Sequence, residues 1–146
     1  MLQDEITVKG RLSIVLIDQL GLVKEEHDFD NLVVTTGKGY IASRMKDATA
    51  TAMSHMAVGT GTTAADVAQT ALVTEANRQA LTSTAVSGGD VTYSATFGNG
   101  QGTGALTEAA ILNASSGGTM LCRTVFSVIN KGANDTLAIT WTVTVS

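Results

Sequence analysis

Proline is absent from this 146-residue sequence, cysteine occurs once, and aromatic residues make up only 4% of it. The single cysteine, Cys122, cannot form a disulfide within the chain, and one thiol with two scattered histidines does not make a zinc site. No apolar run approaches the ~20 residues that a membrane-spanning helix needs. We therefore expect a soluble globular domain that is stabilised by packing alone and holds no metal or cofactor.

Charge is also scarce, and it is unevenly distributed. Only 15% of the residues are charged, against about 25% in an average soluble domain, and 14 of the 22 charged side chains lie in residues 1–47. The net charge of −4 and the lack of a Lys/Arg cluster argue against a nucleic-acid partner, because such partners need their phosphates neutralised. The acidic start, Met1–Glu5, is unlike a secretory signal, so we expect synthesis in the cytoplasm.

Apolar and polar residues alternate near the N-terminus and predict a β-hairpin. Residues 6–18 and 22–29 form its two strands, around a turn at 18–21. The tip of this hairpin is apolar on both sides, which favours contact with another surface; ordinary burial under the rest of the chain is the alternative. The candidate interface residues are Val15, Ile17, Leu20, Leu22, Val23, His27 and Phe29.

One helix and several further strands are expected after the hairpin. A helix is predicted at 37–45, and loops are predicted at 46–52 and over the Gly- and Thr-rich residues 60–70. Strands are predicted at 53–59, 77–86, 91–97, 106–113, 120–129 and 136–145, with the strand at 120–129 in a central position. In the last strand, alternation places Leu137, Ile139, Trp141, Val143 and Val145 inward, and in the first strand it places Ile6 inward.

These elements predict a mainly β fold, an antiparallel β-sandwich or partly closed barrel with an N-terminal β-hairpin and one short helix. Residues 1–30 would form a hairpin arm packed on or extending from the body, and residues 31–146 would form the sandwich body. The lack of proline and charge leaves edge strands unguarded, so neighbouring subunits are expected to cover them.

No motif predicts catalysis. The glycines around Gly59–Gly61 and Gly98–Gly104 lack the lysine and the following helix of a phosphate loop. Cys122 lies in an apolar strand and is expected to be inert, His27 lies among acidic residues, and His55 has no second ligand at fixed spacing. Glu75 and Glu108 are isolated carboxylates, and pairing with Arg78 or Arg123 would satisfy them. A catalytic pair would instead require the two carboxylates to converge in a cleft.

Six segments that together span most of the chain resemble small virion proteins of tailed bacteriophages, which are commonly labelled tail-fibre, tail-collar-like or structural proteins. They are residues 31–45, 56–63, 70–75, 91–97, 104–113 and 138–145. The shared features are patterns of strand and turn, and the family has no catalytic residues to transfer. The resemblance implies a non-enzymatic structural protein located in the virion.

Within this resemblance, a capsid decoration (cement) protein that stabilises the coat shell is the first candidate. We expect a compact subunit because no repetitive shaft follows the last strand. The hairpin at residues 1–30 would lie on the major capsid protein, and decoration proteins of this kind imply a homotrimer. A tail component, namely a tail-fibre, fibre-attachment, neck or baseplate subunit, is the alternative, and a carbohydrate- or receptor-binding module comes third. The expected partners are capsid or tail proteins, without nucleic acid or membrane.

Overall fold

The computed structural model describes residues 4–46 and 50–146, so residues 47–49 of the expected loop lie outside the described part. Strands make up most of it, as predicted, and one helix, α1, is present in the described residues. In chain order the elements are β1 (Val8–Ile17), β2 (Val23–Asp30), β3 (Leu32–Val33), α1 (Thr35–Lys46), β4 (His55–Gly59), β5 (Glu75–Ala80), β6 (Ser83–Ser87), β7 (Asp90–Phe97), β8 (Gly104–Leu112), β9 (Met120–Lys131) and β10 (Thr136–Val145).

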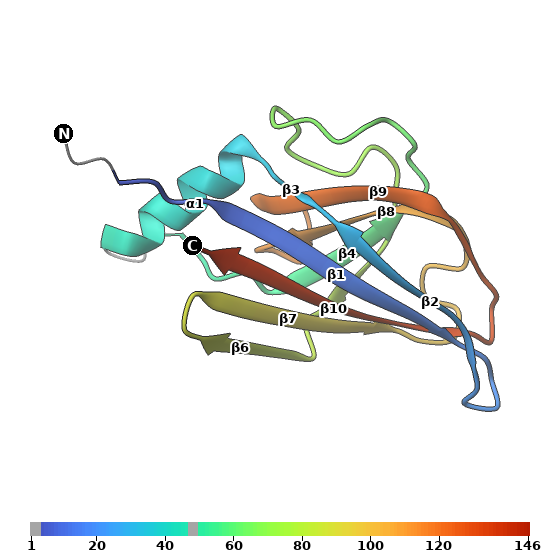
Figure 1. Ribbon diagram of the computed structural model, residues 1–146. Coiled ribbons are helices and arrows are strands. Elements are labelled where there is room, and N and C mark those ends of the chain that lie inside the picture. The colour runs from blue at the N-terminus through green and yellow to red at the C-terminus, as the bar shows by residue number, and fades with distance from the viewer. Residues whose placement is uncertain (1–3, 47–49) are drawn as a thin grey trace.

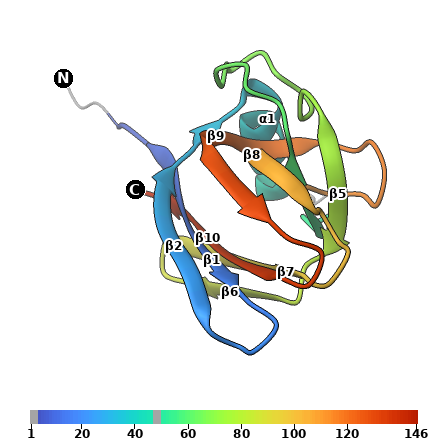
Figure 2. The ribbon, with the colours of Figure 1, turned by 90° about the vertical axis from the view of Figure 1, so that its right-hand side faces the viewer.

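The strands form two antiparallel sheets of five strands each. Sheet A has the order β2-β1-β10-β7-β6, and sheet B has the order β3-β9-β8-β4-β5. Figure 1 shows α1 at one end of the molecule, near the C-terminus, and the β1–β2 turn at the opposite end. The turned view in Figure 2 shows the two layers facing each other, with α1 behind them. Because the sheets share no strand, the fold is the predicted sandwich and not the partly closed barrel.

The core lies between the sheets and follows the predicted alternation. In β10, Leu137, Ile139 and Trp141 point inward and are at most 1% exposed, while threonines alternate with them on the outer face. Two residues predicted to point inward are not buried: Val145 is 39% exposed and Ile6 is 72% exposed. Val145, the last residue of β10, lines a cavity together with Val143, and Ile6 precedes β1.

The strand predicted at 77–86 is wrong as a single element. The chain leaves sheet B after β5, crosses to sheet A at Leu81 and Thr82, and continues as β6. At the crossing, the Leu81 N–H donates to the Ser54 carbonyl and the Thr82 N–H donates to the Ser94 carbonyl. The backbone bends at Thr82, but neither Leu81 nor Thr82 is a residue typical of turns, so the sequence gives no turn signal at the crossing.

Residues of the expected arm supply two strands of sheet A. β1 pairs with β10 from Val8 opposite Val145 to Ile17 opposite Thr136, and β2 pairs with the outer side of β1. The strand predicted to be central, β9, lies between β3 and β8, and its first five residues, 120–124, are all buried. The middle strand of sheet B is nevertheless β8, and β3 pairs with only Arg123 and Cys122 of β9, so the central position predicted for this strand is wrong.

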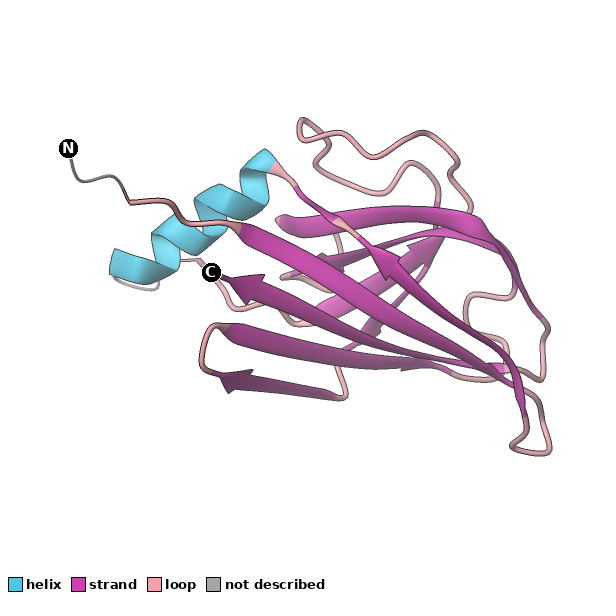
Figure 3. Cartoon of the chain, viewed as in Figure 1, coloured by secondary structure: helices cyan, strands magenta, loops and turns pink. Residues whose placement is uncertain are grey.

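α1 packs against β9 at one end of the sandwich, and a loop covers the outer face of sheet B. At Gly37, α1 lies so close to β9 that an added Cβ would collide with the carbonyl oxygen of Leu121. The residues between β4 and β5 form the predicted loop, which runs over the sheet B side in Figure 3. No helix in the described residues has the length and apolar character needed to cross a bilayer.

Candidate functional site

A fully buried ion pair lies on the outer face of sheet B. Glu108 on β8 and Arg123 on β9 have side chains that are 0% exposed. The Arg123 Nη2 and Nε atoms donate to Glu108 Oε1 over 2.9 and 3.1 Å. Removing two charges from water is costly, so such a pair persists only where further hydrogen bonds satisfy both groups.

Those further hydrogen bonds come from the loop at residues 60–74. Glu108 accepts the backbone N–H groups of Gly61, Val73 and Thr74 over 2.8, 2.9 and 2.8 Å. Arg123 Nη1 donates to the carbonyl oxygen of Thr63 over 3.0 Å and, in the same loop, to the Gln69 side chain over 2.9 Å. We call this arrangement the loop clamp, because the two charges fix both ends of the loop to the sheet.

The loop clamp holds Glu108 in its ionised form. Burial by itself would raise the pKa of this carboxyl, but the N–H groups of Thr74, Val73 and Gly61 and the Arg123 guanidinium outweigh burial and hold the pKa below its ordinary value. Glu108 accepts five N–H donors in all, more than the four lone-pair positions of a carboxylate. No acceptor position remains for a substrate proton, so the arrangement is suited to holding a loop.

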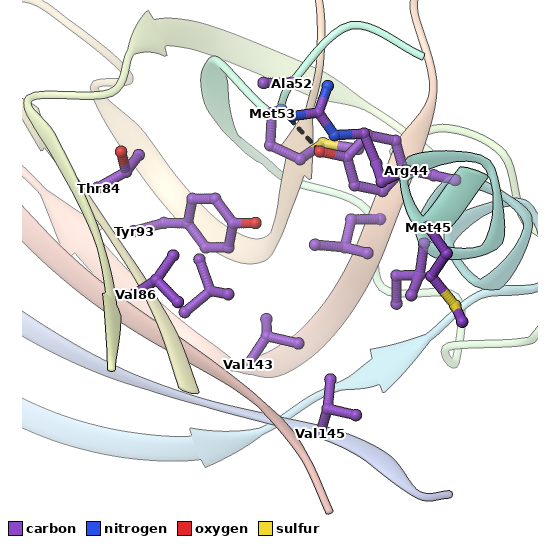
Figure 4. A pocket seen from close by; sticks show the side chains of 13 residues that line it. Arg44, Met45, Ala52, Met53, Thr84, Val86, Tyr93, Val143 and Val145 are labelled. Carbon is purple, nitrogen blue, oxygen red and sulfur yellow. Dashed lines mark hydrogen bonds between the residues drawn. The ribbon is translucent and has the colours of Figure 1, made fainter. Parts of the chain in front are cut away.

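A cavity of about 500 Å³ lies at the α1 end of the sandwich, between the helix and strands β6, β7 and β10. Figure 4 shows the Tyr93 ring entering it from the β7 side, opposite Arg44 and Met45 of α1. The lining residues are Tyr40, Ile41, Arg44, Met45, Ala52, Met53, Thr84, Val86, Val91, Tyr93, Leu121, Val143 and Val145. The cavity is therefore apolar over most of its wall.

The polar groups of the cavity are few, and two are already bonded. The Tyr40 hydroxyl accepts the Met53 N–H over 3.2 Å, and Arg44 Nη1 donates to the Ala50 carbonyl over 2.9 Å. Burial, with smaller contributions from Tyr40 and Cys122, raises the pKa of Tyr93 to about 12, so this phenol stays protonated at neutral pH. Among the described residues that line the cavity, none is a histidine, a carboxylate or a cysteine. The cavity is built to contact apolar groups.

The mouth of this cavity is unusually apolar for an exposed surface. Val86 is 75% exposed, Met45 is 81% exposed and Val145 is 39% exposed. Val86 belongs to β6, which is the outermost strand of sheet A. We call the cavity and this strand together the β6 groove. Large exposed apolar side chains gathered around a hollow are typical of a surface that another molecule covers.

The predicted interface residues of the hairpin divide into two groups. Leu20, Leu22 and Val23 are 78%, 62% and 55% exposed at the tip, and the half-buried Val15 and Ile17 alternate with the buried residues of β1. These residues together leave apolar surface near the β1–β2 turn.

The other two predicted interface residues face the sandwich interior. Phe29 stacks on Phe126 of β9 with a centroid distance of 5.0 Å, and His27 stacks on Phe29 at 5.6 Å. His27 Nε2 also lies 3.0 Å from Glu25 Oε1. Their side chains extend the core toward β2, which agrees with the alternative of ordinary burial.

The remaining candidate groups are engaged within the chain. Glu75 pairs with Arg78 over 2.6 Å, so both isolated carboxylates have the arginine partners that the sequence offered. Burial raises the pKa of the Cys122 thiol. His55 Nδ1 lies 2.7 Å from the Ser54 hydroxyl, and neither residue lines any of the cavities described. In residues 4–46 and 50–146, no group of three or more His, Cys, Asp or Glu side chains is placed to hold a metal ion.

Sequence reasoning missed the β6 groove. Its walls come from four stretches far apart in the chain, and the sequence pattern does not separate β5 from β6. The signal that could have found the groove is the run from Leu81 to Gly89, which contains no charged residue. A scan of protein-family models finds no match to this chain, and searches of curated proteins and of solved structures find none either.

Proposed function

We propose that this chain is a non-enzymatic structural protein of a bacteriophage virion, with capsid decoration as the first candidate role. The virion assignment depends on the resemblance of the six segments to tailed-phage structural proteins. The observation that best supports a structural role is the use of buried charge: the fully buried pair of Glu108 and Arg123 is hydrogen-bonded to the backbone of a loop and fixes that loop to sheet B.

The exposed surface is consistent with a protein that works by contact. Apolar side chains are exposed at both ends of the sandwich, at the hairpin tip and at the β6 groove. A subunit with two such surfaces can bury apolar area against neighbours on both sides, and repetition over many symmetric copies multiplies a modest gain per contact. A decoration protein would stabilise the coat shell in this way, through contacts to the major capsid protein.

A tail component is the second candidate, because the virion proteins that this chain resembles are labelled as tail-fibre or tail-collar-like proteins as well as structural proteins in general. A carbohydrate-binding module is less well supported. Sugar sites present exposed aromatic rings, and no Phe, Tyr or Trp is among the exposed large hydrophobic residues of the described chain.

The test is the copy number of the protein in purified virions, measured by quantitative mass spectrometry against the major capsid protein. A number equal to the coat protein, or a simple fraction of it, is expected for decoration, and capsids without the protein should then break at lower temperature. A few to a few dozen copies would assign it to the tail. Absence from virions would overturn the proposal.

A further inference from the structure

The four outermost strands of the two sheets differ in their protection against pairing with another chain. β2 has the sequence Val-Lys-Glu-Glu-His-Asp-Phe-Asp and pairs with β1 through a register shift. β3 is two residues long, and β5 carries Glu75 and Arg78 beside a second register shift. Charges, bulges and short length are the features with which natural sheets prevent edge-to-edge association.

β6 has none of these features. Its sequence, Ser-Thr-Ala-Val-Ser, is uncharged, it pairs with β7 without a register shift, and all five residues are exposed. Figure 1 shows it at the border of sheet A with no segment beyond it. Five residues is an ordinary strand length, so this edge presents a usable row of backbone donors and acceptors.

We propose that β6 pairs antiparallel with β6 of a second copy of this chain, about a twofold axis at Ala85, so that two copies of sheet A form one continuous sheet. The strand suits pairing with itself. Symmetry about Ala85 places Ser83 opposite Ser87 of the second copy and Thr84 opposite its Val86, so no like charges meet. The same pairing of two β2 strands would bring their acidic side chains together.

The β6 groove supplies apolar surface to the same contact. Thr84 pairs with Tyr93 and Val86 pairs with Val91, so Thr84 and Val86 lie on the cavity side of sheet A. Pairing of two β6 strands therefore brings both Val86 side chains and both cavity mouths to one side of the joined sheet. Val86 and Met45, which are 75% and 81% exposed in the single chain, are the side chains with most apolar surface to remove from water.

This inference goes beyond the proposed virion role and holds or fails separately from it. A twofold contact is satisfied after two copies, so the inference predicts a dimer in place of the trimer that the resemblance implied. The copy number in virions and the mass of the purified protein in solution are independent measurements, so the failure of one proposal is distinguishable from the failure of the other.

The test is analytical ultracentrifugation of the full chain and of three variants. Ala85→Lys and Ala85→Glu each place two like charges opposite each other at the axis and should raise the dimer dissociation constant by about tenfold or more. Thr140→Lys adds the same charge on the outer face of sheet A, on the central strand β10, and should leave dimerisation unchanged. Both positions, Ala85 and Thr140, are exposed, and circular dichroism checks that each variant is folded.

A mixture of Ala85→Lys and Ala85→Glu chains gives the sharpest result, because only opposite charges then meet at the axis. We expect the mixture to recover a dimer that neither variant forms well alone. A wild-type chain that stays monomeric at all concentrations, a trimer, or a mixture no better associated than its components would each overturn the inference. Equal weakening by Thr140→Lys would also overturn it.

Discussion

The loop clamp lies wholly in the low-charge residues 48–146, the β6 groove lies partly in them, and the two regions differ in how they use charge. Residues 48–146 contain eight charged side chains, and every one of them makes a hydrogen bond or an ion pair within the chain. At the loop clamp, two of these charges are completely buried and fix a long loop. At the β6 groove, Arg44 is the one charged residue among the described lining residues, and it comes from the charge-rich first part of the sequence.

This difference shows how a chain with few charges can hold a long loop in place and still leave an edge strand uncharged. Buried charges hold irregular backbone in place, because each buried carboxylate or guanidinium satisfies several N–H or C=O groups at once. The few charges of this part of the chain lie elsewhere, so β6 lacks the charges that normally keep an edge strand apart from other chains. Internal order and an unguarded surface are thus two consequences of one composition.

The largest effect is expected from breaking the loop clamp. Arg123→Ala leaves Glu108 ionised and buried without its partner, which should lower the free energy of unfolding by about 3–5 kcal/mol. Chemical denaturation monitored by Trp141 fluorescence measures the loss. The matched control is Arg11→Ala, which removes a 3.6 Å pair between exposed side chains and should cost at most about 1 kcal/mol. Equal losses in the two variants would show that the buried pair has no special weight.

A smaller effect is expected from crowding the loop without removing either charge. In Gly61→Ala the new Cβ would lie 2.5 Å from Glu108 Oε2 and 2.7 Å from the Val73 Cβ, so the loop must shift, at a cost of about 1–3 kcal/mol. Gly39→Ala in α1 is the control, because no atom lies within 4 Å of its added Cβ, and alanine favours a helix by about 0.5–1 kcal/mol over glycine. The midpoint temperature of thermal unfolding should therefore fall for Gly61→Ala and rise for Gly39→Ala.

As the pH is lowered, the loop clamp should lose stability while the pairing of β6 with β7 is still intact. The pKa of Glu108 is lower in the folded chain than in the unfolded chain, so its contribution is fully present above the ordinary carboxyl pKa and is lost as the pH falls through the folded value. We expect the Gly61, Val73 and Thr74 amides to lose protection against hydrogen exchange at acidic pH, measured relative to their intrinsic exchange rates. The β6–β7 amides should keep their protection on the same scale. Glu108→Gln should remove this pH dependence. Simultaneous loss of protection in both regions would contradict the prediction.

The two regions also differ in how far the sequence predicted them. Alternation in β10 predicted the burial of Leu137, Ile139, Trp141 and Val143 correctly, because period-two burial is set within a single strand. The arginine partners of Glu75 and Glu108 could be named in advance, since a nearly uncharged region offers few alternatives. The bonds from Glu108 to the loop could not, because they join backbone groups 34 to 47 residues away. Predicting the β6 groove required recognising that the chain changes sheets at Leu81 and Thr82, where the residues give no turn signal.

The smallest effect on folding is expected in the β6 groove itself, and this contrast tests whether its apolar surface serves a partner. Val86 and Val143 both line the cavity, but they are 75% and 4% exposed. In dilute solution Val86→Ser should change the free energy of unfolding by no more than about 0.5 kcal/mol, as surface substitutions do. Val143→Ser should cost about 1.5–3 kcal/mol or more, since a buried valine loses its apolar contacts and a hydroxyl replaces them. If Val86→Ser leaves folding intact and still weakens self-association in sedimentation experiments, that side chain contributes to contact between chains. If Val86→Ser destabilises the single chain as strongly as Val143→Ser does, the valine belongs to the core, and the groove is no separate surface.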